Sequence, residues 1–488
     1  MRKNPRQTLA ILAAALLSGC AVGPNFLRPE APATQQYTAA PLPEQTASAE
    51  ISGGDAQRFI ADADIPGQWW TQFGSPELNA LVDQALRNNP NITAAQASLS
   101  QFEQFVRVSR GALFPQVTGN GFSGQQAFVD NSPFQFYNVS ANVSLVLDVF
   151  GGIRRSIEAA GAGAEFQRFQ LEATYLSLIS NVLTTAIATA TLSAQIDAIN
   201  DIIAAQSMQL DLLNQQFELG AVARGDVLAQ QSQLAITQAQ LPNLARQLAF
   251  ARNALAVLQG GTPSERPIPV IDLANLKLPQ ELPVSVPSKL VEQRPDIRAS
   301  EALLHQASAQ IGVATAAMLP SFSLSGSLER AWDTRPQLLP PSSPAWALAQ
   351  NLAIPLFRGG SLLASRRAAV FAFDRANALY RGSVLTAFAD VANVLAALQL
   401  DADLLRAQLY AEESARQSFE ITLERYQAGA IAYIALLDSQ RVFQQTRINL
   451  VTAQANRYND TVALFSALGG GWWNRQDIVE EQKVSSNE

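Results

Sequence analysis

The sequence contains very few residues of the types that disulfides and metal sites require. Cys20 is the only cysteine and His305 the only histidine among 488 residues, which excludes a disulfide and a Cys- or His-based metal cluster within one chain. No nucleophile–base pair stands out elsewhere, so we predict no enzymatic activity, no metal and no cofactor. We interpret His305 as a helix-surface or packing residue.

Lysine is also scarce, and the chain carries a formal net charge of −7. An acidic chain has no electrostatic reason to bind a phosphate backbone, which argues against a nucleic-acid partner. The hydrophobic content of 48% is nevertheless ample for a core.

Long hydrophobic runs are missing from the mature sequence. After the leader, no stretch reaches the ~18 uninterrupted apolar residues of a transmembrane helix. The leader has the basic residues Arg2, Lys3 and Arg6 followed by a short apolar core at 9–17, which is typical of a signal peptide. If the mature chain crosses a membrane, we therefore expect it to do so as strands.

The leader ends in Leu17-Ser18-Gly19-Cys20, which resembles the bacterial lipobox. The only thiol thus stands where the lipidation chemistry needs one, and we predict a covalent lipid on Cys20; the alternative is an ordinary residue near a cleavage site. Ala21 follows rather than Asp, which by resemblance to sorted lipoproteins favours the outer membrane. A multi-chain lipid anchor holds a protein on a membrane surface without spanning it.

The sequence repeats itself across its middle. The segment NPNITA at 89–94 returns as RPDIRA at 294–299, and Gly-Ala-Val-Ala at 220–223 returns as Gly-Ala-Ile-Ala at 429–432. The offset between the halves grows by only four residues, from 205 to 209. Two halves that share one architecture predict a pseudo-symmetric assembly rather than an enzyme.

Composition and the repeat divide the chain into segments. Residues 21–67 are rich in Pro, Ala, Gln and Thr and predict an extended tether, with order beginning near Trp69. The predicted segments are the signal peptide 1–19, the lipidated tether 20–67, the first repeat 68–258, a linker 259–286, the second repeat 287–468 and a C-terminal tail 469–488.

The period of the apolar residues changes from helical to two after Pro115 and Pro320. Between 139 and 149 every odd residue is apolar and most even residues are Asn or Ser, and residues 321–329 alternate in the same way. This alternation is typical of a transmembrane barrel strand, although a half-exposed soluble strand also gives it. Four such segments at repeat-related positions favour the barrel: about 115–128, 135–150, 320–331 and 344–357.

The segments after the strands, about 153–258 and 361–468, are strongly helical, and Pro242 is their only proline. As one helix, residues 153–219 would extend about 100 Å. A seven-residue register, which predicts coiled-coil packing, runs through the second part of each segment. Its members are Val227, Leu234, Leu241, Leu248 and Leu255, then Leu436, Phe443, Leu450 and Leu464, with Arg457 as the one break.

Four strands per chain are too few for a closed barrel, since the narrowest barrels have about eight. Open strand edges cannot lie in lipid, so the chain must form an oligomer to close its barrel. Three copies would give twelve strands in a cyclic assembly, and four copies would also close.

Several motifs together resemble the TolC/OprM outer-membrane factor family, most closely its lipidated NodT-type branch, over essentially the whole mature chain. They are the lipobox, Gly23-Pro24-Asn25, Trp69-Trp70, the two proline-anchored repeats, Leu356-Phe357-Arg358-Gly359-Gly360 and Ala467-Leu468-Gly469-Gly470-Gly471-Trp472. The resemblance implies a mainly α homotrimer, with a 12-strand outer-membrane β-barrel continued by a long periplasmic α-helical barrel. It also implies the exit duct of a tripartite efflux pump, with a periplasmic adaptor (a membrane fusion protein) and an inner-membrane RND-type transporter.

The two turns between the long helices are the predicted docking tips. Glycine at a helix end supplies the left-handed conformation that stops the helix, and small residues allow close packing. By resemblance the tips dock the adaptor; the alternative is a hairpin turn without a partner. The tip residues are Gly220, Ala221, Val222 and Ala223 in the first half and Gly429, Ala430, Ile431 and Ala432 in the second.

The predicted pore constriction is Asp438, with Ile434 one helical turn before it. By resemblance, Asp438 matches a carboxylate that narrows the pore, and copies facing one axis would attract cations and repel anions. Family members often have a second acid where Ala435 stands here, so we expect a weaker ring. A solvated surface Asp438 is the alternative.

Three functions compete on the sequence alone. The leading one is a passive conduit for small molecules such as drugs and toxic compounds. The second is the outer-membrane duct of a type I protein secretion system, with the same architecture and a polypeptide cargo. The third is a structural coiled-coil lipoprotein without a pore, which does not explain four amphipathic strands at repeat-related positions.

Overall fold

The structure is a computed structural model that describes residues 21–34, 36–127, 132–265, 268–333 and 344–475. Cys20 and the tail after residue 475 lie outside these residues. The chain divides into two units, and each takes segments from both halves of the sequence. Unit 1 comprises Met1–Glu30, Gln96–Gln170 and Arg298–Ser383, and unit 2 comprises Ala31–Ala95, Leu171–Ile297 and Val384–Glu488.

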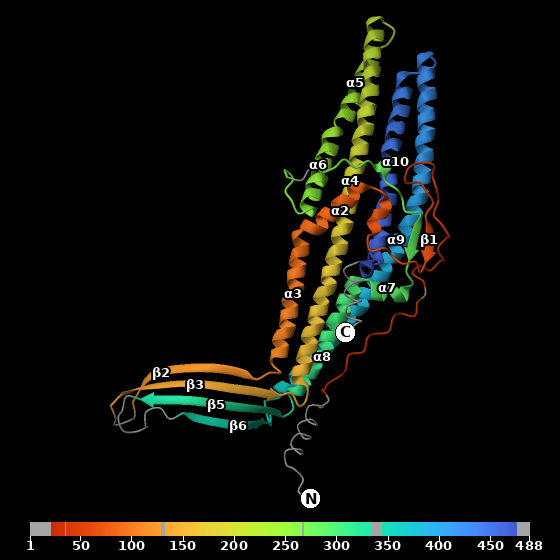
Figure 1. Ribbon diagram of the computed structural model, residues 1–488. Coiled ribbons are helices and arrows are strands. Elements are labelled where there is room, and N and C mark those ends of the chain that lie inside the picture. The colour runs from red at the N-terminus through yellow and green to blue at the C-terminus, as the bar shows by residue number, and fades with distance from the viewer. Residues whose placement is uncertain (1–20, 35, 128–131, 266–267, 334–343, 476–488) are drawn as a thin grey trace. The chain divides into compact units, whose positions relative to one another are not determined.

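Unit 1 contains an antiparallel sheet in the order β2-β3-β5-β6 (Figure 1). Its strands are β2 (Gln116–Gln126), β3 (Phe134–Leu147), β5 (Ser321–Asp333) and β6 (Ala345–Ala353). The structure thus has a strand in each of the four segments where alternation predicts one. Pairing of Leu147 with Phe322 and of Ser321 with Ala353 places the helix-connected ends of the strands at one end of the sheet.

The register gives this sheet one apolar and one polar face. Val143 lies between Val117 and Gly326, whereas the next residue, Asn142, lies between Thr118 and Ser327. Successive side chains of a strand point to opposite faces, so the valines share one face and the hydroxyl and amide groups share the other. In the described part of the chain, the edge strands β2 and β6 pair on one side only.

Four helices contribute residues to both units: α3 (Pro90–Gly111), α4 (Gly152–Glu218), α8 (Pro295–Ala316) and α9 (Ser361–Gln427). The helices α4 and α9 have 67 residues each, as the scarcity of proline in these segments predicts. Each also contains a window of 18 residues that is apolar enough, by length and composition alone, to cross a membrane. Core helices of soluble proteins share this property, so it does not assign these helices to a bilayer.

The remaining helices belong to unit 2: α2 (Pro76–Asn88), α5 (Arg224–Gln238), α6 (Leu241–Leu258), α7 (Pro287–Gln293) and α10 (Tyr433–Ala467). Pro90 begins α3 directly after α2, as predicted, because proline suits the first turn of a helix but not its interior. Pro242 likewise stands in the first turn of α6 and separates it from α5. Since the second half has no matching proline, α10 continues unbroken for 35 residues.

The expectation that order begins near Trp69 is wrong, because residues 31–67 of the predicted tether are part of unit 2 and contain a strand. Its strand β1 (Arg58–Ala61) pairs in parallel with β4 (Glu281–Val284), a segment of the predicted linker. Gln57, just before β1, is fully buried and accepts a hydrogen bond from Arg457 at 2.9 Å. Four residues that pair through their backbone leave no hydrophobic period, so this strand has no signal in the sequence.

Unit 2 also contains three short 3₁₀ helices: η1 (Trp69–Phe73), η2 (Leu273–Asn275) and η3 (Trp472–Asn474). The rings of Trp69 and Phe465 are both fully buried and stack with their centroids 4.9 Å apart. Trp472 donates its indole N–H to the carbonyl of Gln293 at 2.6 Å. The first contact holds η1 against α10, and the second holds η3 against the end of α7.

Candidate functional site

The two predicted tips are tight turns of the same construction, and both lie in unit 2. Gly220 and Gly429 have φ angles of +72° and +70°, in the left-handed region that glycine adopts without strain. The following residues, Ala221 and Ala430, donate their N–H groups to carbonyls five residues upstream, at 2.8 and 2.9 Å. This is the Schellman arrangement that ends a helix. No atom lies within 4 Å of a Cβ built on either glycine, so backbone conformation, rather than crowding, requires them.

The structure brings the two tips together around one groove. Its volume is about 220 Å³, and residues of both turns line it, among them Val222 and Ile431. These two side chains are half-buried, whereas the other six tip residues are exposed. The tips therefore present small side chains and open backbone to solvent. The groove between them is lined by Val222 and Ile431 together with polar side chains such as that of Gln216.

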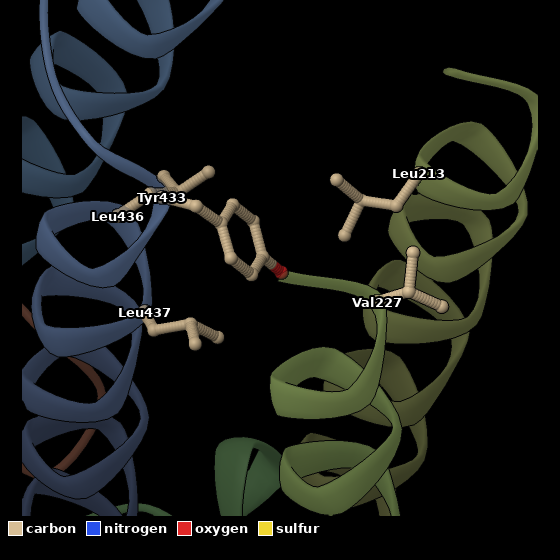
Figure 2. Close-up of a cluster of buried hydrophobic side chains, with 5 residues drawn as sticks. All are labelled: Leu213, Val227, Tyr433, Leu436 and Leu437. Atoms are coloured by element: carbon tan, nitrogen blue, oxygen red, sulfur yellow. The ribbon is translucent and has the colours of Figure 1, made fainter. Parts of the chain in front are cut away.

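Below the tips, a cluster of buried hydrophobic residues joins the two hairpins (Figure 2). Leu213 of α4 and Val227 of α5 face the ring of Tyr433, which begins α10. Leu436 and Leu437, on the next turn of α10, complete the cluster. Val227 and Leu436 belong to the predicted seven-residue register, and both are buried. The register thus identified part of the surface where the hairpins meet.

Tyr433 adds a buried hydrogen bond to this apolar contact. Its hydroxyl donates to Oε1 of Gln230 on α5 at 2.6 Å, and Nε2 of Gln230 donates to the carbonyl of Gln206 on α4 at 2.8 Å. Burial raises the pKa of the Tyr433 hydroxyl, and the nearby Tyr426 and Asp226 raise it further. The hydroxyl therefore stays protonated and able to donate at any physiological pH.

Neither Gln230 nor Tyr433 is among the residues predicted from the sequence. Tyr433 stands 209 residues after Arg224, so the two occupy matching positions of the repeat. Comparison of the two halves could have drawn attention to this position, since it is charged in the first half and aromatic in the second. Which helix the aromatic ring would contact depends on tertiary packing, so periodicity alone could not supply the pair.

The predicted constriction residues lie on a different face of α10. The side chain of Asp438 is 66% exposed and Ile434 is 58% exposed in the single chain, one helical turn apart. Arg441, on the same face, places Nη1 3.5 Å from Oδ1 of Asp438. Its Nε donates to Oε1 of Gln233 on α5 at 2.7 Å. The Asp438 carboxylate thus has beside it a cation that is hydrogen-bonded to α5 of the other hairpin.

Arg441 is the residue that the sequence reading of the constriction missed. It stands three residues after Asp438, a spacing at which helix side chains meet, so the signal was present. A ring of Asp438 residues needs several copies, and the constriction therefore stays a prediction.

The predicted lipidation residue, Cys20, lies outside the described residues, but the segment after it is fixed to unit 1. The N–H of Val22 donates to the carbonyl of Phe150 at 3.0 Å. Arg155, almost fully buried, donates to the Val22 carbonyl at 3.1 Å and to Oδ1 of Asn25 at 2.7 Å. This segment therefore begins its course where β3 passes into α4.

His305 packs against the same segment, as its interpretation as a packing residue predicts. Its ring stacks on Phe26 with centroids 4.4 Å apart, and its Nε2 lies 3.0 Å from a carboxylate oxygen of Glu158. Among the described residues, no group of three or more His, Cys, Asp or Glu side chains is placed to hold a metal ion.

Comparison with known proteins places this geometry in one family. A family profile described as outer membrane efflux protein matches residues 81–261 and 286–470. The toluene efflux pump outer membrane protein TtgF of Pseudomonas putida is 30% identical over 478 residues, which cover 96% of this chain and 97% of that protein. The cation efflux system protein CusC of Escherichia coli is 27% identical over 481 residues, covering 96% and 99%.

A solved structure shows the same fold. The outer-membrane channel OprN superposes with a TM-score of 0.81 at 27% identity, covering 93% of this chain and 100% of that one. The fold of this chain is therefore similar to that of a known outer-membrane channel.

Proposed function

Because this chain belongs to the outer membrane efflux protein family, it is an outer-membrane transport protein and not an enzyme, and we propose that it forms the outer-membrane channel of a tripartite efflux pump. In this proposal the channel is passive. It receives small toxic molecules from a periplasmic adaptor and an inner-membrane RND-type transporter and conducts them to the exterior.

The four-stranded sheet of unit 1 is the observation that carries the proposal. One of its faces is apolar, as lipid requires, and the other carries hydroxyl and amide groups, as a water-filled lumen requires. Its edge strands β2 and β6 have one partner each within the described chain. Unpaired edges in lipid are costly, so β6 of one copy pairs with β2 of the next until the barrel closes.

Three copies satisfy this closure with twelve strands, and the copies then form a cyclic homotrimer. In this proposal the helices α4 and α9, each about 100 Å long at 1.5 Å per residue, form an α-helical barrel that continues the conduit. Their far ends are the two tips, whose exposed small residues support a role in docking the adaptor.

Asp438 and Ile434 form the constriction in this proposal, with Arg441 modifying its charge. Three carboxylates around a narrow axis would strongly prefer cations. The guanidinium beside each carboxylate weakens that preference, and it ties the constriction to α5 through Gln233. Movement of one hairpin against the other would therefore move the charges at the axis.

A lipid on Cys20 is the only non-protein group that the proposal requires. The contacts of Arg155 and Phe150 with Val22 support it, because they hold the chain two residues after Cys20 beside the end of β3. The acyl chains would then enter the same leaflet that surrounds the helix-side ends of the strands.

The names of the relatives support small toxic compounds as cargo, since TtgF is a toluene pump component and CusC belongs to a cation efflux system. The polar sheet face described above has few charges, which suits cargo of varied structure. We propose that the transporter and adaptor, rather than the channel, select the substrate.

Dye accumulation in cells that lack this gene tests the proposal, with and without a plasmid copy and beside a protein survey of the culture medium. We expect raised accumulation of a fluorescent dye that the plasmid copy reverses. Normal accumulation together with a protein missing from the medium would instead assign the channel to type I protein secretion.

A further inference from the structure

Four helix–strand junctions meet at one end of the sheet of unit 1, and only two of them carry unpaired charge. At the junction of β3 and α4, Asp148 and Arg154 form an ion pair at 3.2 Å. The junction of α8 and β5, residues 313–320, has no charged residue. The two remaining junctions belong to the edge strands: α3 with β2, and β6 with α9.

The edge junctions are basic and contain no acid. The sequence has no Asp or Glu between Glu103 and Asp130, nor between Asp333 and Asp374. Five arginines of these segments have exposed side chains, and within the described residues none of them forms an ion pair. We call this group the basic collar: Arg107, Arg110, Arg358, Arg366 and Arg367.

Large apolar side chains stand between the collar and the strands. Phe114 is 66% exposed, and Leu356 and Phe357 are 91% and 89% exposed. Phe114 lies two residues before β2, and Leu356 and Phe357 lie just after β6. Arg366 and Arg367 follow within about 10 Å along the axis of α9, at 1.5 Å per residue. Apolar groups next to the strand ends and arginines just beyond them match the order of acyl chains and headgroups at a membrane interface.

In the proposed barrel, the edge junction of a neighbouring copy brings no acid to the collar. Closure of the barrel brings the β2 edge of one copy to the β6 edge of the next, and both edges carry arginines. The contact therefore places like charges together, which is unfavourable without a counter-ion. An anion from outside the protein has to supply the negative charge.

We propose that the basic collar and its exposed apolar residues bind anionic phospholipid headgroups in the leaflet next to the helices, at each seam between copies. The phosphate pairs with the arginines, and the acyl chains pack on Phe114, Leu356 and Phe357. This inference rests on the proposed membrane-spanning sheet, and it adds that anionic lipid stabilises the contact between copies.

Native mass spectrometry of the purified full-length protein tests it, with equal amounts of phosphatidylglycerol and phosphatidylcholine added. We expect the assembly to retain phosphatidylglycerol preferentially. Collar arginines are replaced with glutamine singly (R110Q, R358Q) and all together (R107Q/R110Q/R358Q/R366Q/R367Q, the fivefold variant). Each arginine removed should lower the affinity for phosphatidylglycerol by a factor of about five, because one arginine near an anionic surface strengthens binding by about that factor. The matched control is R375Q/R381Q, which removes two exposed arginines farther along α9.

Several results would contradict the proposed binding of anionic lipid by the collar. They are no preference in the wild-type protein, an unchanged preference in the fivefold variant, an equal loss in the R375Q/R381Q control, and complete displacement of the lipid by inorganic phosphate. Smaller assemblies with unchanged lipid retention would show that the arginines serve protein contacts alone. Conductance across a bilayer of pure phosphatidylcholine, which contains no anionic lipid for the collar to bind, tests the channel separately. A protein that conducts there without lipid preference would contradict the collar and leave the proposed function standing.

Discussion

Arg457 occupies the one position where the seven-residue register of α10 lacks an apolar residue. It is fully buried nevertheless, and its guanidinium donates to Oε1 of Gln57 at 2.9 Å and to the carbonyl of Asp55 at 3.2 Å. A buried charge needs hydrogen-bond partners, and the partners of Nη2 come from the segment before β1, whereas Nε has none within the described residues. The sequence marked this position as an exception, but its partners lie about 400 residues away and could not be predicted.

Asp460 provides a test at the same scale. Burial and the nearby charge of Asp401 on α9 raise the pKa of Asp460 to about 7, although Arg457 opposes the shift. The folded protein therefore holds a proton that the unfolded chain releases near pH 4, so this group destabilises the fold as the pH rises from about 4 to 7. We expect Asp460→Asn to raise Tm by clearly more at pH 8 than at pH 5, because at pH 5 only part of this penalty has developed. Thermal denaturation of the full-length protein at the two pH values measures the difference. An equal shift at both pH values would contradict this assignment.

The hydroxyl of Tyr433 is the second test at the residue scale. Tyr433→Phe leaves Oε1 of Gln230 buried without a donor, which costs about 1–3 kcal/mol. We expect faster hydrogen exchange at the start of α5 and α10, about tenfold or more, because this local contact opens more often. Tyr426→Phe is the matched control, since Tyr426 lies beside Tyr433 and its own hydroxyl makes no hydrogen bond within the described residues. Equal protection in both variants would remove Tyr433 from the contact between hairpins.

At the scale of elements, the sequence predicted those helix ends and strands that depend only on residues close together in the chain. Proline placed the break between α2 and α3, and apolar alternation placed the four strands. Local sequence did not predict that β1 pairs with β4, because Arg58 and Glu281 meet through backbone pairing across 223 residues. Nor did it predict the contact of Tyr433 with α5, which depends on how two hairpins pack. The tips fell between these cases: their turns were predictable from glycine, and their shared groove was not.

The tip glycines give a prediction at this scale. Gly429→Ala puts a side chain at a φ of +70° and should destabilise the turn by about 1 kcal/mol. We expect a lower Tm and raised dye accumulation at equal amounts of protein in the outer membrane. Gly225→Ala is the control, because Gly225 lies in α5 at an ordinary φ with open space around it, and this substitution should not lower Tm. Identical behaviour of the two variants would show that the left-handed turn is unimportant.

For the whole molecule, the proposed channel depends on copies of a sheet that one chain leaves open. The apolar face, the polar face and the two unpaired edges become consistent only when β2 and β6 meet in an assembly around a lumen. The alternation of the strands is the observation from which this assembly is predicted, and the assembly stays a prediction. The number of copies and the arrangement at the constriction depend on contacts between chains, which a single sequence does not specify.

Single-channel recording of the purified full-length protein in a planar bilayer tests the central claim most directly, for the wild type and for Asp438→Ala. Removing the carboxylate leaves the guanidinium of Arg441 at the constriction, so we predict a larger conductance and a lower preference for cations. Unchanged values for both would remove Asp438 from the pore. Failure of both proteins to conduct ions would contradict the channel itself.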